Sequence, residues 1–580
     1  MRYLWLGGLL VLLLNACSTP TAKQAASPIH IRWAHDPETL DPLTLPNQSA
    51  IDAINLLHLS LLQVDYQRNA YAPALAQELP KAQLVGDSLT LIDYRLRPAA
   101  TWDDGRPVLA TDVAFTLKLI QCPGLPIENS RAQFSFIRQV RLDPADPRHF
   151  VLVCRGQGTE VLNASGDFSI LPENPLDPAH TLRQLSLAAL QDWPTARPPA
   201  PVVAALVRRY QRANLARQPE HLPGCGPYRL AAWETNQRLR FQRKAHWWAD
   251  TLRPAPFVLQ ARPRQLVFVI LPDDGAAVLA LRRHELDVYA QIPARLFQQL
   301  QASKAAQQEF VFYTNSSYTM LMAGFNTQRP ALHDRQTRQA LSRLFDPAGL
   351  LAATQLGEGN RTVGLLPPSN PFYNDSLPLL AYAPAQAIAL LRRAGWQRWP
   401  DGHWQRPGTA APLALSLRYR TGDATHATVA LQFQAAAMQV GIPVTLVPTE
   451  NSVLTSSLQA GDFDLYISML KGSPMGFNFA PILHSAAIGS GNLSRFGQPA
   501  TDQLLMTLTT EGNERRKRLL LRRFQVMMQV EMPIVPLFFL PYRMAVSRQL
   551  RHVVASGLKP GYAATALSWA TPGTLQPAPH

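Results

Sequence analysis

Cysteine is scarce in this chain, with 4 among 580 residues. No two cysteines stand at Cys-x-x-Cys spacing or in a Cys/His ligand pattern, so the sequence does not support a zinc site. The patterns Gly-x-x-x-x-Gly-Lys, His-Glu-x-x-His and Gly-x-Ser-x-Gly are also missing. We therefore expect no catalytic residues, no metal and no cofactor. Because a catalytic triad is spatial, these absences alone do not exclude an enzyme.

Charged residues are also few, at 16%, whereas 47% of the residues are hydrophobic and 8% aromatic. This composition is typical of a folded globular protein and excludes collagen, a coiled coil and a disulfide scaffold. The length suggests roughly three or four domains, or fewer large lobes. The net charge is +15, but the arginines are scattered, so a nucleic-acid partner is not supported. The densest basic run, 515–523, has helical apolar spacing and predicts a solvated helix face.

The first segment predicts export. Arg2 is followed by eleven apolar or glycine residues, Leu4 to Leu14, which are too few for a transmembrane helix of roughly 20 residues. A charged start, a short apolar run and then small residues are typical of a signal peptide, here residues 1–16. No comparable run occurs later in the chain. We therefore expect a periplasmic or other extracytoplasmic protein.

The end of this signal resembles the lipobox of bacterial lipoproteins. The residues are Leu14-Asn15-Ala16-Cys17, although Asn15 departs from the small or hydroxylated residue usual at its position. The resemblance implies cleavage before Cys17 and lipid attachment to its sulfur. Residues 17–27 would then be the lipidated cysteine and a polar tether. The alternative is an ordinary secretory signal with an incidental cysteine.

Three cysteines remain in the mature chain: Cys122, Cys154 and Cys225. In an oxidising compartment a disulfide is plausible, and Cys122 with Cys154 is the closer pair in sequence. The alternative is three buried free thiols. The sequence leaves both open.

Strand and helix patterns alternate along the chain, which predicts an α/β fold without obvious repeats. Strand patterns occur at 29–33, 89–96 and 444–447. Helix patterns occur at 49–64, from Thr111-Asp112 onward, and at 337–344, 384–394 and 425–439.

A series of short motifs resembles one protein family. In this order they are similar to landmarks of the family 5 extracellular solute-binding proteins, which are peptide- and nickel-binding components of ABC importers. The motifs are Leu40 to Pro42, Ala72 to Ala76, Tyr94 to Arg97, Trp102 to Phe115, Gly224 to Tyr228, Leu281 to Asp287, Phe325 to Thr327, Ala383 to Gly395, Gly461 to Leu465 and Pro533 to Leu537.

The resemblance implies an α/β clamp of the type II periplasmic-binding-protein fold, with an additional α/β domain inserted in the first lobe. Lobe I would comprise 28–66, 223–305 and 533–580. The additional domain would be 67–222, and lobe II 306–532. Ligand would be enclosed between the lobes, and the closed form would dock on a membrane permease driven by ATPase subunits.

One family landmark is missing. Peptide-binding members carry an Asp shortly after the Phe-Asp-Leu strand, where it meets the peptide amine. Here Ser473 stands at that place by spacing, and the nearby charge is Lys471. Either Asp462, Asp464 or another acid substitutes, or the ligand is anchored differently. We hypothesise that Lys471 pairs with an anionic group of the ligand, the alternative being a solvated loop lysine.

The resemblance and the residue types together give a set of candidate ligand-binding residues. Aromatic and apolar side chains near the implied cleft could pack against a ligand, although core packing is an alternative for each. The set is Trp33, Tyr466, Met469, Leu470, Lys471, Ser473 and Phe477.

The expected function is a lipid-anchored, monomeric receptor that captures oligo- or dipeptides for an ABC importer. Its partners would be the solute, the inner-membrane permease with its ATPase subunits, and the membrane through the lipid. Two other functions stay open. One is the same fold binding a nickel chelate, an oligosaccharide or a modified peptide. The other is an exported hydrolase.

Overall fold

The structure is a computed structural model that describes residues 27–44, 47–86, 88–194, 198–409, 411–474 and 476–570. The predicted signal peptide, Cys17 and all of the tether except Ser27 lie outside these residues. Within the described ranges, no helix combines the length and the apolar character needed to cross a membrane.

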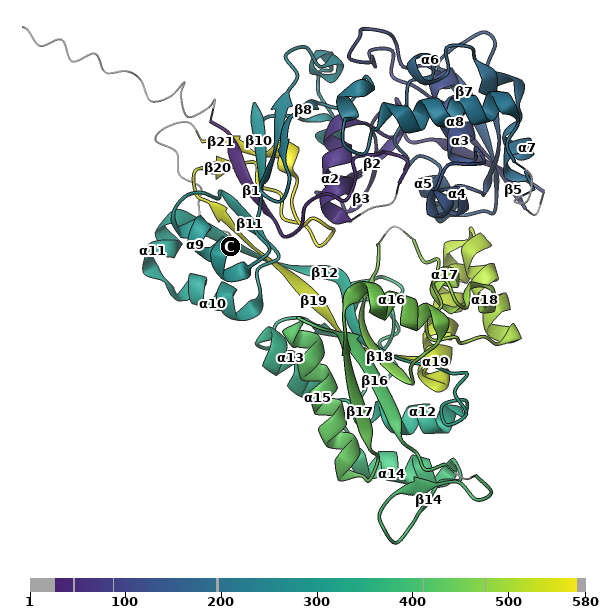
Figure 1. Ribbon diagram of the computed structural model, residues 1–580, viewed down its shortest axis with the longest axis vertical. Helices are drawn as coiled ribbons and strands as arrows, with labels where there is room; N and C mark the ends of the chain where they lie inside the picture. The colour runs from purple at the N-terminus through teal and green to yellow at the C-terminus, as the bar shows by residue number, and fades with distance from the viewer. Residues whose placement is uncertain are drawn as a thin grey trace, which may run out of the picture.

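One mixed sheet of 11 strands runs through the molecule in the order β17-β16-β18-β12-β19-β11-β1-β10-β9-β8, with β13 beside β19. β12 (Phe310–Phe325) and β19 (Ile534–Ser547) are long antiparallel strands shared by both halves (Figure 1). The half that we call lobe I adds β1 (Ile29–Trp33), β8 (Tyr228–Glu234), β9 (Arg238–Arg243), β10 (Gln265–Ile270) and β11 (Val288–Ala290). Lobe II adds β13 (Asn360–Arg361), β16 (Leu415–Arg420), β17 (Val444–Thr449) and β18 (Leu465–Lys471).

Both faces of the lobe II sheet are buried, as the alternation of β12 requires. Leu321, Ala323 and Phe325 pack into one apolar core, whereas Met320 and Met322 pack into a second core on the other face. The flanking helices of lobe II are α12 (Arg335–Ser342), α13 (Pro347–Gln355), α14 (Pro384–Arg393), α15 (Ala424–Gln439), α16 (Asn451–Ala460), α17 (Ala480–Leu483), α18 (Pro499–Thr510) and α19 (Glu514–Glu531).

A second sheet forms what we call the additional domain, at the upper right of Figure 1. Its order is β4-β5-β7-β6, and all neighbours are antiparallel. Its core is continuous with that of lobe I. Its elements are β4 (Lys81–Val85), β5 (Leu89–Arg95), β6 (Ile137–Leu142), β7 (His149–Arg155), α3 (Ala110–Ile120), α4 (Glu128–Gln133), α5 (Thr159–Ala164), α6 (Glu173–Leu176), α7 (Leu187–Gln191) and α8 (Pro201–Ala213). The remaining helices of lobe I are α2 (Gln48–Leu57), α9 (Asp274–Arg282), α10 (Ala294–Ala302) and α11 (Lys304–Glu309).

The α/β prediction is confirmed, and most of the predicted elements are present. One helix is shorter than predicted: α2 ends at Leu57, because residues 62–65 form β2 (Leu62–Asp65), which pairs with β3 (Ala70–Pro73). A run of Leu and Val fits both the helical period and the strand period. The hydrophobic pattern alone therefore assigned this strand to the helix. The residue limits of the lobes and of the additional domain remain a prediction.

The two long strands lose their register where they pass from lobe I to lobe II. Ser316 pairs with Pro541, but the next pair is Met320 with Phe539, so β12 carries two extra residues here. The Ser317 hydroxyl donates to the Leu540 carbonyl across this bulge, at 2.5 Å. A bulge bends a strand pair and interrupts its ladder. The ladder between the two long strands is thus interrupted where they pass between the lobes.

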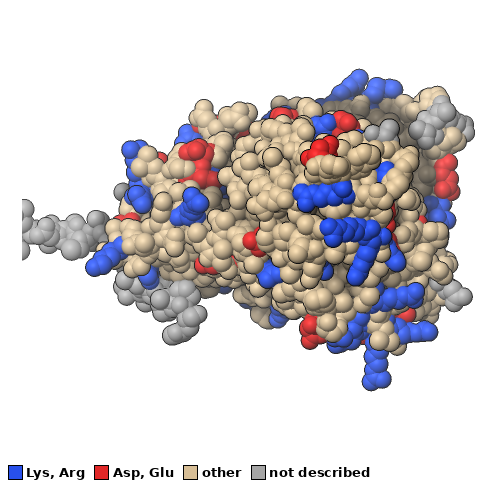
Figure 2. Space-filling model, turned by 90° about the horizontal axis from the view of Figure 1, so that it is seen from below, with Lys and Arg blue, Asp and Glu red and all other residues tan. Residues whose placement is uncertain are grey.

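The basic run at 515–523 lies on α19, as predicted, with one exception. Arg515, Arg516 and Arg518 are exposed, whereas Lys517 is buried together with apolar side chains of the opposite face. Figure 2 shows basic side chains spread over one face of the molecule among fewer acidic ones. The solvated-face interpretation therefore holds for the arginines and is wrong for Lys517.

The suggested disulfide between Cys122 and Cys154 is not present. Both residues and Cys225 are free, buried thiols. Cys122 lies at the end of α3 and Cys154 within β7, each surrounded by the apolar core. Burial raises the pKa of each thiol to about 12. The alternative of three buried thiols is therefore the one realised.

Candidate ligand-binding site

A cavity of about 860 Å³ lies between the additional domain and lobe II. One wall comes from β3, α4, the end of β7 and α5. The other comes from the bulge of β12, the end of β18 and the segment that follows it. This volume lies within the range of small-molecule sites, roughly 300 to 1,000 Å³.

Four of the predicted residues line this cavity: Leu470, Lys471, Ser473 and Phe477. Lys471 is the last residue of β18 and pairs with Thr319, within the bulge of β12. The next residue continues this attachment, because the Gly472 amide donates to the Tyr318 carbonyl at 2.7 Å. The bulge thus holds the exposed Lys471 at the rim of lobe II.

The other three predicted residues do not belong to the lining of this cavity. Trp33 is 5% exposed and stacks on Phe268 in the core of lobe I, with ring centroids 3.9 Å apart. Tyr466 is buried against Gly324 of β12. Met469 lies within β18 and does not line the cavity, although the next two residues do. For Trp33 and Tyr466, core packing is the role that the structure displays.

A contact that the sequence did not indicate joins the two walls. Glu160 on α5 of the additional domain accepts two hydrogen bonds from the Lys517 ammonium on α19 of lobe II, at 2.7 and 2.9 Å. Glu160 also accepts the amide N–H of Phe477 at 3.1 Å. The two charged side chains are only 11% and 8% exposed. We call this contact the Glu160–Lys517 bridge.

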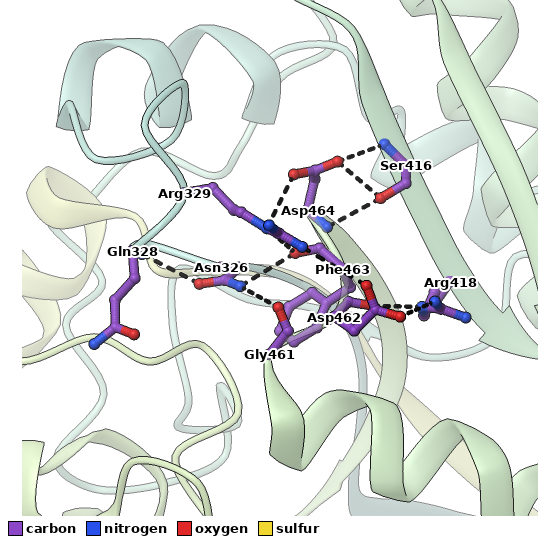
Figure 3. A network of polar contacts seen from close by, with 9 residues as sticks. All are labelled: Asn326, Gln328, Arg329, Ser416, Arg418, Gly461, Asp462, Phe463 and Asp464. Atoms are coloured by element: carbon purple, nitrogen blue, oxygen red, sulfur yellow. Dashed lines mark hydrogen bonds and ion pairs between the residues drawn. The ribbon is translucent and has the colours of Figure 1, made fainter.

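The carboxylates proposed as substitutes for the missing Asp lie elsewhere (Figure 3). Asp464 accepts the Ser416 amide and hydroxyl at 2.8 and 2.7 Å, and lies 3.5 Å from Arg329. Asp462 pairs with Arg418 at 2.5 Å. Neither carboxylate lines the cavity. Through these contacts the two carboxylates stabilise the turn between α16 and β18, which is a structural role.

Asp167 is a cavity residue that the sequence did not indicate. Its carboxylate accepts a hydrogen bond from the Tyr71 hydroxyl at 2.6 Å, and both residues line the cavity. Asp167 also lines a side pocket of about 130 Å³ that reaches into lobe I and contains Asp52 and Tyr66. Burial raises the pKa of Asp167 above its ordinary value and that of Asp52 to about 7.

The positive charge of Lys471 repels that of Lys559. Burial, followed by the positive charge of Lys471, lowers the pKa of Lys559 to about 8. Asp52 opposes this shift. Lys559 belongs to the C-terminal segment that follows β19, and Lys471 to lobe II. Lys471 lines the cavity, whereas Lys559 is not among its lining residues.

Comparison with known proteins identifies this architecture. Residues 70–488 match the family described as bacterial extracellular solute-binding proteins, family 5 Middle, which is most of the chain. The chain belongs to this family. It is therefore an extracytoplasmic solute-binding component of an ABC importer, and the two-lobed fold is the type II clamp.

Relatives and solved structures of the family agree with this assignment. The periplasmic murein peptide-binding protein MppA of Escherichia coli (strain K12) is 24% identical over 532 residues, covering 87% of this chain and 86% of MppA. Protein XP55 of Streptomyces lividans is 26% identical over 501 residues, covering 85% of this chain and 80% of that protein. The structure of the oligopeptide-binding protein AppA of Bacillus subtilis with a nonapeptide superposes with a TM-score of 0.72 at 18% identity, covering 94% of this chain and 99% of AppA. The structure of NikZ of Campylobacter jejuni in complex with Ni(L-His) superposes with a TM-score of 0.71 at 18% identity. The match covers 93% of this chain and 99% of NikZ. At these identities the two structures establish the fold alone.

Proposed function

We propose that this family 5 protein is a lipid-anchored receptor that captures peptides in the cavity between its lobes and delivers them, chemically unchanged, to a membrane permease. The observation that carries the proposal is the cavity of about 860 Å³ between two walls that the Glu160–Lys517 bridge joins. The relative MppA, by its name a murein peptide-binding protein, supports a peptide as the solute. The motif ending at Cys17 supports the lipid anchor.

The charges of the cleft support a ligand with a free carboxylate. Lys471 lines the cavity, and its repulsion of Lys559 is relieved when an anion lies near both ammonium groups. The carboxyl terminus of a peptide is such an anion, and a hydrogen bond to a charged group is stronger than one between neutral groups. We therefore assign Lys471 and Lys559 to the carboxylate end of the ligand.

A thermal-shift screen tests the peptide assignment. The soluble chain starting at Ser18 is heated with pools of tri- and tetrapeptides, with nickel chelates and oligosaccharides as parallel sets. A ligand at 100 times its Kd stabilises the folded state by about 2.7 kcal/mol, so the melting temperature is expected to rise by a few degrees with peptides. Mass spectrometry is expected to recover the peptides intact. A response to another set alone, or turnover of the peptides, would contradict the proposal.

The substitution Lys471→Ala tests whether lobe II binds the carboxyl-terminal end of the peptide. We expect binding of free-acid peptides to weaken by about 10-fold, because one charged hydrogen-bond donor is lost, whereas C-terminally amidated peptides are little affected. Calorimetric titration measures both. Lys304→Ala, on the surface helix α11, removes the same charge away from the cavity and serves as the control. Equal losses for acids and amides would contradict the assignment.

A further inference from the structure

The cavity has an acidic group whose charge no protein cation balances. Among the described residues that line it, the carboxylates are Glu160 and Asp167. Glu160 is engaged by Lys517. Asp167 has no ion pair among the described residues, and its hydrogen-bond partner there is the neutral Tyr71 hydroxyl. The charge on Asp167 is thus left for a group that enters the cavity.

Asp167 is accessible to a ligand in the cavity. The residue is exposed to the space inside the cavity, yet the surrounding protein desolvates its carboxylate and raises its pKa. A carboxylate in such a place costs free energy unless a cation accompanies it. Asp167 is therefore an exposed carboxylate of the cavity lining, with no cation paired to it among the described residues.

The neighbourhood of Asp167 strengthens its preference for a cation. Asp52 lies in the adjoining side pocket. The phenol of Tyr66 lies close enough that the negative charges of Asp52 and Asp167 both raise its pKa. The hydrogen bond from Tyr71 orients the carboxylate. Acidic and phenolic groups thus gather beside Asp167. The charge of Lys559 acts on Asp52 and is not among the causes that shift the pKa of Asp167, and Lys471 lies on the lobe II wall.

We propose that Asp167, oriented by Tyr71, binds the terminal ammonium group of the captured peptide. This inference rests on the proposed function. It places the amine anchor on the additional domain, whereas the resemblance led us to expect it after β18, where Ser473 stands. The peptide then spans the cavity, with its amine on the additional domain and its carboxylate near Lys471. A ligand with both free termini contacts both walls, so closure favours short zwitterionic peptides.

The test compares one peptide pool in two chemical forms. A mixed-sequence pool of tri- and tetrapeptides with free amines and the same pool N-acetylated are titrated into the soluble chain starting at Ser18. We expect the wild type to prefer the free amines by about 10- to 100-fold, the effect of one charged hydrogen bond in an enclosed site. In Asp167→Asn this preference is expected to fall to within about 3-fold. The asparagine still accepts the Tyr71 hydrogen bond, which preserves the local fold.

Two further variants isolate the role of the carboxylate. Asp192→Asn, in the same domain but paired with Arg138 at the surface, is expected to retain the full preference. Tyr71→Phe keeps the carboxylate, removes its orienting hydrogen bond, and is expected to lower the preference only partly; it also tests the proposal if Asp167→Asn does not fold. Equal binding of both pools by the wild type, or an unchanged preference in Asp167→Asn, overturns this inference and leaves peptide capture intact. Binding of neither pool by the wild type overturns both.

Discussion

Lys517→Ala is expected to weaken peptide binding by about 10- to 100-fold, although Lys517 makes up no part of the cavity lining. In the closed cleft the variant leaves Glu160 buried without its cation, which costs a few kcal/mol. When the cleft opens, Glu160 is hydrated and this cost disappears. The closed state is therefore less populated, and apparent affinity falls in proportion to the fraction that is closed. Calorimetric titration measures the affinity.

Small-angle scattering separates this explanation from damage to the site. The unliganded variant is expected to be more extended than the wild type, and saturating peptide is expected to restore the compact form. Arg516→Ala is the matched control, because it removes a neighbouring exposed cation from the same helix. If Lys517→Ala binds peptide as tightly as the wild type does, the Glu160–Lys517 bridge does not contribute to closure.

His58→Gln is expected to make the protein less sensitive to acid. His58 is 2% exposed at the end of α2, and burial, followed by the charge of Lys244, lowers its pKa to about 3. The folded state therefore keeps His58 neutral while the unfolded chain takes up a proton near pH 6.5. The stability from this residue is complete above pH 6.5 and is lost as the pH falls toward 3. Between pH 7.5 and 4.5 the variant should lose about 2 to 3 kcal/mol less than the wild type.

Urea unfolding at the two pH values, followed by tryptophan fluorescence, measures this difference. His246→Gln is the control, because His246 is exposed and is expected to leave the pH dependence unchanged. An equal loss of stability in His58→Gln and the wild type would contradict the role given to His58.

Local pattern predicted those elements whose periodicity was unambiguous. The strand predicted at 29–33 is β1, and the helix predicted at 425–439 is α15 to within one residue. The helix predicted from Thr111-Asp112 begins one residue earlier, at Ala110, and Asp112 accepts the Leu109 amide from inside the first turn. Pattern failed at 62–65, where only the pairing of β2 with β3 distinguishes strand from helix.

The candidate site was predicted only in the segment that the family resemblance marked. Leu470, Lys471, Ser473 and Phe477 line the cavity because they lie at and after the end of β18. Met469 was in the same list but does not line the cavity. The motif indicated the segment and not the direction of each side chain.

The sequence by itself determined the family, the α/β class and the absence of the expected Asp, because these depend on residue identity and local periodicity. Only the tertiary structure decided which acids face the cleft. Glu160 and Lys517 are 357 residues apart, and Asp167 and Tyr71 are 96 apart, so no local pattern links them. Whether a carboxylate is paired, solvated or available to a ligand depends on which residues the fold places next to it. For that reason Asp462 and Asp464 proved structural and Asp167 became the candidate anchor.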